Sequence, residues 1–337
     1  MNAPASTEAS LLFFIVRRLI QSIVVMFVAA FVIYWLVAVT ADPLAQYREQ
    51  NPRPSQAFFE AKSKQLGLNH SIPVRFFDWL GHFVTGNFGN DISGNPVRPQ
   101  LFEALGVTIR LVVGALVIAI VLAVVVGVFT AVRQHKFGDY FFSVVCYVLI
   151  AIPSFWFAAL LRQGALGFNG HVGSNVIPTV NEETAGISLF ASGWPLVQDR
   201  LMHLILPTIS LAALSFAAWS RYQRATMLDV LGSDYLRFAR AKGIPWPKVL
   251  IRHGLRNALI PVTTVVAIGA GALLSGAIIT EKIFAWHGLG ALFLDSLGRG
   301  DQNMICGYLM FAASFVIVLN LVADLLYAVL DPRIRLT

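Results

Sequence analysis

Six long apolar runs limit what this chain can fold into more than any other feature of its sequence. They occupy residues 19–40, 104–132, 140–161, 203–220, 258–283 and 303–330. A helix needs about 20 mostly apolar residues to cross a bilayer, and the runs are close to that length or longer. The first run exceeds the apolar core of a signal peptide, which has about 7–15 residues. The sequence therefore predicts an all-α polytopic membrane protein with six transmembrane helices.

The composition agrees with a membrane location. The 337 residues are 57% hydrophobic and 13% charged, and the mean hydropathy is +0.69, whereas a soluble domain has about 25% charged residues. Cys146 and Cys306 both lie in apolar runs. They form neither a disulfide framework nor a metal-binding spacing, so we interpret them as small buried residues.

The distribution of basic residues predicts the orientation. Six spans put both termini on one side, together with the short connectors. The segments on that side are 1–18, 133–139, 221–257 and 331–337. These short segments hold more than half of the 25 lysines and arginines, and short basic loops are typical of the cytoplasmic side. We therefore expect cytoplasmic termini and place the long segments 41–103 and 162–202 outside. The net charge of +7 is then a topology signal and does not indicate nucleic-acid binding.

A short polar helix is predicted inside the loop 221–257. Ser233 is a suitable N-cap residue, and Asp234 places a negative charge in the first turn, where it suits the helix dipole. Gly243 supplies a C-terminal stop, and Pro245 prevents the helix from continuing. A helix of about nine residues is too short to be stable alone in water. We therefore expect it to dock on a partner, and we expect a second helix to follow and run into the fifth span.

The same stretch resembles a known family. Its strings ARAKG (239–243) and RHGLRNALIP (252–261) resemble the cytoplasmic coupling loop of binding-protein-dependent ABC importers. More narrowly, they are similar to the first (B-type) permease of the oligopeptide and dipeptide importers. The importer consensus begins Glu-Ala-Ala, where this chain has Arg237, Phe238 and Ala239. Only the second Ala and Gly243 match, a departure that is common in the peptide branch.

Further strings in order along the chain extend the resemblance to residues 17–335, except 162–202. They are ADPL (41–44), the segment 66–89, GNPV (94–97), PSFW (153–156), HLILP (203–207), EKIFAWHGLG (281–290) and Asn320, Asp324, Tyr327 and DPR (331–333). The resemblance implies an importer permease core over 104–330 in a bacterial inner membrane.

The resemblance also implies partners and a coupling site. The expected partners are a second homologous permease, two ATPase domains on one chain or two, and an extracytoplasmic peptide-binding protein. ATP and Mg would be held by the ATPases, with no cofactor in this chain. The residues implied in ATPase coupling are Ser233, Asp234, Arg237, Ala239, Arg240, Ala241, Lys242, Gly243 and Pro245.

Motifs for catalysis are not found in the sequence. It contains no P-loop, no His-Glu-x-x-His and no Gly-x-Ser-x-Gly, so we expect neither catalytic residues nor a metal site. Transport energy must then come from a partner ATPase or from an ion gradient. The second alternative is an ion-coupled transporter that uses Asp324 and His287. Within the importer hypothesis the substrate is a peptide, with nickel or glutathione as alternatives.

Two further features concern the spans themselves. Pro153 is expected to bend the third span, and the candidate translocation-path residues are Pro153, Ser154, Phe155 and Asp324. Asp324 also has a structural interpretation, because Asn320 lies on the same helix face and an interhelical hydrogen bond would suit both. Small residues recur at 115, 119, 123, 127 and 131, and again at 267, 271 and 275. Such stripes let another helix approach closely, so we predict two packing seams.

Overall fold

The computed structural model describes the backbone of residues 5–49 and 51–330 and the side chains of 16–45, 47–49 and 51–322. The chain divides into two compact units. Unit 1 contains residues 1–11, 109–286 and 318–337, and unit 2 contains 12–108 and 287–317. Asp324 and residues 331–337, which carry part of the predictions above, lie outside the described side chains.

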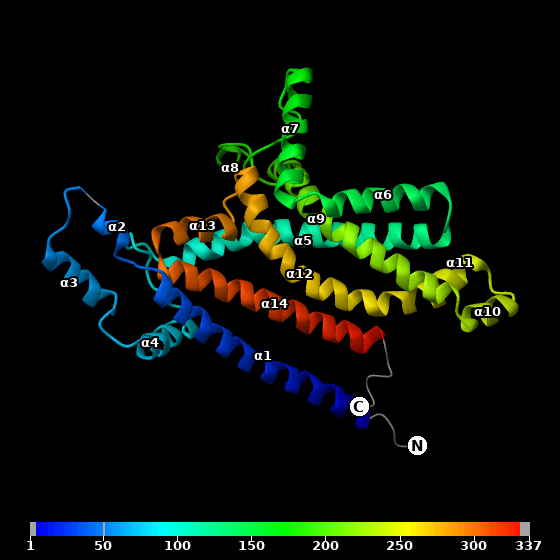
Figure 1. Cartoon of the computed structure of the whole chain (residues 1–337), viewed down its shortest axis with the longest axis horizontal. Coiled ribbons are helices and arrows are strands. Elements are labelled where there is room, and N and C mark those ends of the chain that lie inside the picture. The colour runs from blue at the N-terminus through cyan, green and yellow to red at the C-terminus, as the bar shows by residue number, and fades with distance from the viewer. Residues whose placement is uncertain (1–4, 50, 331–337) are drawn as a thin grey trace. The chain divides into compact units, whose positions relative to one another are not determined.

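The described residues form helices and no β-strand; one isolated bridge joins Asn90 and Pro96. The helices are labelled in Figure 1. They are α1 (Ala5–Thr40), α2 (Ala45–Arg48), α3 (Gln56–Gln65), α4 (Ile72–Val84), α5 (Val97–Val132), α6 (Phe137–Ala151), α7 (Ser154–Val172), α8 (Ile187–Phe190), α9 (Trp194–Leu231), α10 (Asp234–Ala241), α11 (Trp246–Val249), the π-helical segment Leu250–Leu255, α12 (Arg256–Phe284), α13 (Leu289–Arg299) and α14 (Gln302–Leu330). The all-α membrane fold expected from the sequence is confirmed.

Within the described part of the chain, five helical stretches are long and apolar enough to cross a membrane. They are Val16–Thr40, Val97–Val132, Trp194–Leu231, Trp246–Phe284 and Gln302–Val322. A sixth span exists if α6 and α7 are counted together. Five of the predicted spans fall inside α1, α5, α9, α12 and α14, and 140–161 is shared by α6 and α7. The number of membrane crossings remains a prediction.

The predicted bend at Pro153 is a complete break between α6 and α7. The two helices make an angle of 108°. Ile152 adopts an extended backbone at the C-terminal end of α6, and Pro153 is the N-cap of α7. Both follow from the proline, which lacks an N–H and disfavours helical geometry in the residue before it. The predicted third span, 140–161, is therefore divided between two helices.

The predicted loop 162–202 is also partly helical. Helix α7 continues to Val172, and α9 already begins at Trp194. The glycines and polar residues at the two ends of the predicted loop did not prevent helix formation. The part between is fixed by hydrogen bonds within unit 1. Thr184 binds Asp199 through its backbone N–H and its hydroxyl, at 2.8 and 2.6 Å, and Arg200 donates to Glu183 at 2.8 Å.

The first predicted seam lies inside unit 1. Ala115, Ala119 and Ala123 are almost fully buried. A Cβ added at Gly127 would lie 2.7 Å from Gln223 Cβ and 2.8 Å from the Ser220 carbonyl oxygen, so α5 and α9 touch there at the backbone. The second predicted seam is different, because Ser275 is exposed. On α12 the tight contact is made by Gly269 instead, whose added Cβ would lie 2.9 Å from Trp219.

Unit 2 has a core in which α1, α4 and α14 meet. Its buried members are Ala30, Tyr34, Val37, Phe76, Trp79, Ile305, Cys306 and Met310. Polar contacts hold the loops to this core: Asp301 accepts from the Ile92 N–H at 2.9 Å, and Arg75 donates to Gln302 at 2.6 Å. Both cysteines of the chain are free and buried, as expected from the sequence.

Candidate coupling surface

The short helix predicted after Ser233 is α10, and its boundaries match closely. Ser233 has an extended backbone at the N-cap, and Gly243 follows the helix with a left-handed φ of +78°. The expected side-chain cap is not formed. The Ser233 hydroxyl donates to the carbonyl of Val230 at 2.5 Å, because α9 ends directly before it and leaves carbonyls without helical partners.

Helix α10 is attached to the rest of unit 1 by one side chain in particular. Leu236 is 2% exposed. A Cβ added at Gly254 would lie 3.2 Å from Met227 Cε and 3.7 Å from Leu236 Cδ2. Glycine at 254 therefore leaves the space in which Leu236 and Met227 meet. The burial of Leu236 gives α10 the fixed orientation that its own hydrogen bonds cannot supply.

The helix that follows α10 is continuous from Trp246 to Phe284 but contains one π turn, Leu250–Leu255. The predicted second helix is confirmed. The first buried positions along this helix are Val249, Gly254 and Ala258, so the first two are five residues apart and the next two are four apart. Single π turns inside α-helices are frequent at functional sites.

The surface around α10 is strongly basic. Arg240 lies over the ring of Trp246, with 5.0 Å between the guanidinium carbon and the ring centroid, a contact that ties α10 to α11. The exposed cations of the segment are Arg237, Arg240, Lys242, Lys248, Arg252 and Arg256. One of them has an acidic partner nearby: Asp234 lies 3.4 Å from Arg237, and both side chains are exposed. Such an exposed pair contributes little to stability.

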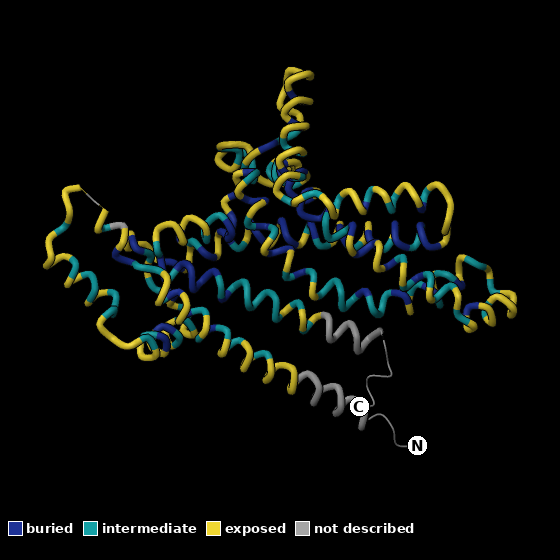
Figure 2. Tube along the Cα trace, in the orientation of Figure 1, coloured by how far each residue is buried: buried dark blue, intermediate teal, exposed yellow. Residues whose placement is uncertain are grey.

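Two aromatic side chains of α10 point away from the protein and were not singled out by the sequence analysis. Phe238 is 69% exposed and Tyr235 is 42% exposed, and exposed residues predominate along α10 in Figure 2. Ala239, which we expected in the contact face, is only partly exposed. Because Leu236 faces inward, Phe238 stands on the outer side of the helix. The outward face is therefore aromatic and basic.

A buried ion pair supports the same end of unit 1. Arg224 of α9 donates to both carboxylate oxygens of Asp139 at 2.8 Å, and the Asp139 side chain is 4% exposed. The backbone N–H of His135 also donates to Asp139. Nearby, Ala131, Met227 and Ala258 form a buried cluster. The ends of α5 and α9 and the start of α12 thus form one packed base for α10.

The nine predicted coupling residues lie in one continuous segment around α10, from Ser233 to Pro245. The predicted path residues are less well defined. Pro153, Ser154 and Phe155 lie at the break between α6 and α7, where Phe155 is 54% exposed. The side chain of Asp324 is outside the described residues, so no common site with Pro153 is shown.

Comparison with known proteins identifies the family. Residues 123–336 match the family model described as Binding-protein-dependent transport system inner membrane component. Residues 11–99 match a second model, the N-terminal part of the same kind of membrane component. The chain belongs to this family of ABC importer permeases. The resemblance stated from the sequence is confirmed, and the chain is a membrane-embedded transport subunit.

Relatives of known name match nearly the whole chain. The oligopeptide transport system permease protein OppB of Mycobacterium tuberculosis (strain ATCC 25618 / H37Rv) is 39% identical over 324 residues, 96% of this chain and 99% of the relative. The oligopeptide transport system permease protein AppB of Bacillus subtilis (strain 168) is 37% identical over 328 residues, with coverage of 96% and 99%. The glutathione transport system permease protein GsiC of Escherichia coli O1:K1 / APEC is 32% identical over 325 residues, with coverage of 96% and 98%.

Proposed function

We propose that this permease forms, with a second homologous permease, the membrane pathway of an ATP-driven peptide importer. Two partner ATPase domains would hold ATP and Mg, and an extracytoplasmic binding protein would deliver the peptide. The membrane would be the inner membrane of a bacterium. The relatives named for oligopeptide transport at 37–39% identity support this substrate class.

One observation carries the coupling part of the proposal. Helix α10 is fixed on its inner side by Leu236 and presents Phe238, Tyr235 and several cations on its outer side. A large aromatic side chain that is held rigidly and left exposed is the kind of residue that dominates a protein interface. The cations would favour an acidic rim around a groove on the ATPase. Movement of that groove would be passed through α10 to α9 and α12.

Phe238→Ala tests this proposal. Truncating a central aromatic anchor commonly costs 1–2 kcal/mol or more, so we expect about tenfold weaker binding of the ATPase and a matching loss of peptide uptake. The measurements are copurification of the ATPase and peptide accumulation in vesicles that contain the whole complex. Phe190→Ala is the matched control, because Phe190 is 91% exposed but lies in the segment predicted to be outside. Unchanged ATPase binding by Phe238→Ala would contradict the coupling role.

The energy source and the substrate need separate assays. Uptake of labelled oligopeptide, dipeptide, glutathione and nickel is compared in vesicles, with ATP inside or with a proton gradient alone. We expect ATP-dependent uptake of oligopeptide. Uptake that follows the proton gradient without ATP would favour the ion-coupled alternative, and ATP-dependent uptake of glutathione or nickel alone would change the substrate class.

A further inference from the structure

Helix α4 lies against the part of α1 that is apolar enough to cross the membrane. Phe76 of α4 makes edge-on ring contacts with three residues of α1: the centroid distances are 5.9 Å to Phe27, 5.1 Å to Phe31 and 5.7 Å to Tyr34. Trp79 adds a second contact with Tyr34 at 5.3 Å. All these residues belong to unit 2.

These contacts fix the depth of α4 relative to the span. The apolar stretch of α1 ends at Thr40, and a helix rises 1.5 Å per residue. Tyr34 therefore lies about 9 Å from that end and Phe27 about 20 Å from it, measured along the helix. A helix packed between these levels lies beside the half of the apolar stretch that ends at Thr40.

The side chains of α4 are sorted into three faces. The first packs inward and includes Phe76 and Trp79, which are buried. The second is apolar but exposed: Phe77 is 60% and Val84 77% exposed. These two positions are seven residues apart and lie on one side of the helix. The third face is polar.

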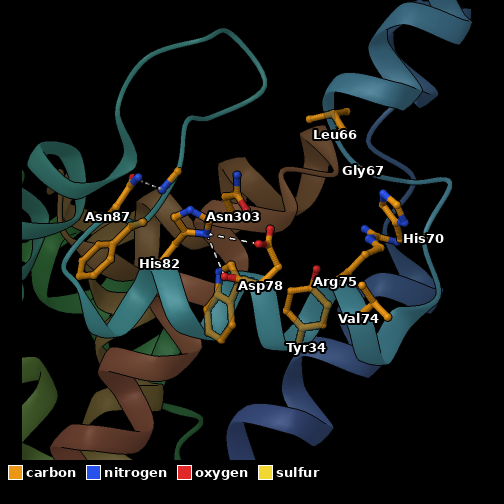
Figure 3. A pocket seen from close by; sticks show the side chains of 13 residues that line it. Tyr34, Leu66, Gly67, His70, Val74, Arg75, Asp78, His82, Asn87 and Asn303 are labelled. Atoms are coloured by element: carbon orange, nitrogen blue, oxygen red, sulfur yellow. Dashed lines mark hydrogen bonds and ion pairs between the residues drawn. The ribbon is translucent and has the colours of Figure 1, made fainter.

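The polar face consists of Arg75, Asp78 and His82. It lines a cavity of about 460 Å³ together with Tyr34 and Asn303, among others (Figure 3). His82 Nδ1 lies 3.8 Å from the Asp78 carboxylate, and both side chains are more than half exposed. The polar side chains that line this cavity can be hydrated by water. At 100° per residue the polar positions are turned away from Phe77 and Val84, whereas Val74 lies next to Asp78 and lines the same cavity.

We infer that α4 is an interfacial membrane helix: its face of Phe77 and Val84 lies at the headgroup–acyl boundary on the Thr40 side of the α1 span, and its polar face opens to water. An apolar face and a polar face on one short helix are typical of helices that lie in this boundary. The buried third face keeps α4 attached to the protein.

The neighbouring surface of α1 indicates that lipid covers the apolar face of α4. Along the same stretch of α1, Val28, Trp35, Leu36 and Val39 are 55%, 52%, 56% and 67% exposed. Such a surface has to be covered by acyl chains or by another apolar partner, and Trp35 stands at the level where membrane proteins collect tryptophan. The apolar face of α4 lies at the depth of this surface. The inference depends on α1 crossing the bilayer and not on the substrate proposed above.

Spin labels on single introduced cysteines test the inference in the complete complex, reconstituted in phospholipid vesicles. The positions are Phe77→Cys and Val84→Cys on the apolar face, with Asp78→Cys on the polar face as the matched control. The native Cys146 and Cys306 are buried. Oxygen, which concentrates in lipid, and a neutral nickel chelate, which stays in water, are used as relaxing agents.

We expect labels at 77 and 84 to collide several times more often with oxygen than with the nickel chelate, and the ratio to reverse at 78. A high nickel collision rate at 77 and 84 would place this face in water and overturn the inference. Low rates for both agents would show that a protein partner covers the face, and this result would overturn it equally.

Discussion

Gly243 is the residue at which the backbone most restricts the choice of side chain on the coupling surface. Its φ is +78°, and nothing lies within 4 Å of an added Cβ, so only backbone strain opposes substitution. Left-handed geometry costs an ordinary residue about 1–2 kcal/mol and costs Asn less. We predict that Gly243→Val loosens the turn and reduces peptide-stimulated ATPase activity several-fold, whereas Gly243→Asn keeps most of it. Equal activity in both variants would argue against a strained turn.

The contribution of the Glu183–Arg200 pair to stability can be tested by changing the pH. Its hydrogen bond from Arg200 holds the pKa of the Glu183 carboxyl below its usual value. A lowered pKa means that the pair stabilises the fold above the unfolded pKa, about 4.3, and that this contribution is lost as pH falls through the folded pKa. We predict that wild type melts slightly above Glu183→Gln at pH 7 and that the difference disappears toward pH 3. Thermal unfolding of both proteins in detergent measures this.

Individual residues show where sequence reasoning reached its limit. Ser233 and Gly243 were predicted correctly as the ends of α10 because end signals are local. Phe238 was missed, because its exposure depends on Leu236 packing beside Met227 and Gly254, which belong to other helices. Asp139 and Arg224 are 85 residues apart in the sequence and join two helices. No local sequence pattern predicts this ion pair.

Among the helices, α5 was predicted best, since its small-residue stripe is an internal seam. Gly127→Ala would push a methyl group to within 2.7 Å of Gln223 and 2.8 Å of the Ser220 carbonyl. We expect a loss of about 1–3 kcal/mol, the usual cost of overpacking, seen as a lower melting temperature. Gly106→Ala is the control on the same helix, because its added Cβ meets nothing within 4 Å. A normal melting temperature for Gly127→Ala would show that α5 and α9 can separate there.

Helix α12 shows why a stripe of small residues does not by itself identify its partner. The predicted seam of Ala267, Gly271 and Ser275 is half-exposed or exposed, whereas Gly269 and Ala270 face Trp219 and the core. Periodicity gives a face of a helix, and the neighbouring helices decide whether it is covered. The lengths of the helices were likewise underestimated. Polar residues such as Arg162 lie within α7, and the Arg162 guanidinium donates to the carbonyl oxygen of Ile283 in α12 at 2.9 Å.

For the whole molecule the orientation in the membrane is still a prediction. Single cysteines at Asn90 and Leu189, both exposed, should react with an impermeant thiol reagent in intact cells. A cysteine at Lys242 should react only after lysis. Labelling in the opposite order would invert the topology and place α10 outside, which would leave no role for an ATPase there.

The π turn before α12 sets the phase between two halves of one continuous helix. Each residue turns an α-helix by about 100°. Five residues of a π turn advance about as far around the axis as four residues of an α-helix, so Val249 and Gly254 face the same side. If the same residues formed an unbroken α-helix, Val249 and Trp246 would be rotated by about 100° relative to Gly254 and Ala258. Leu236 would lose its place beside Gly254, and Phe238 would point in a new direction. The π turn therefore takes up one extra residue and keeps the buried positions on its two sides in line, and α10 keeps its direction only while this turn stays π-helical.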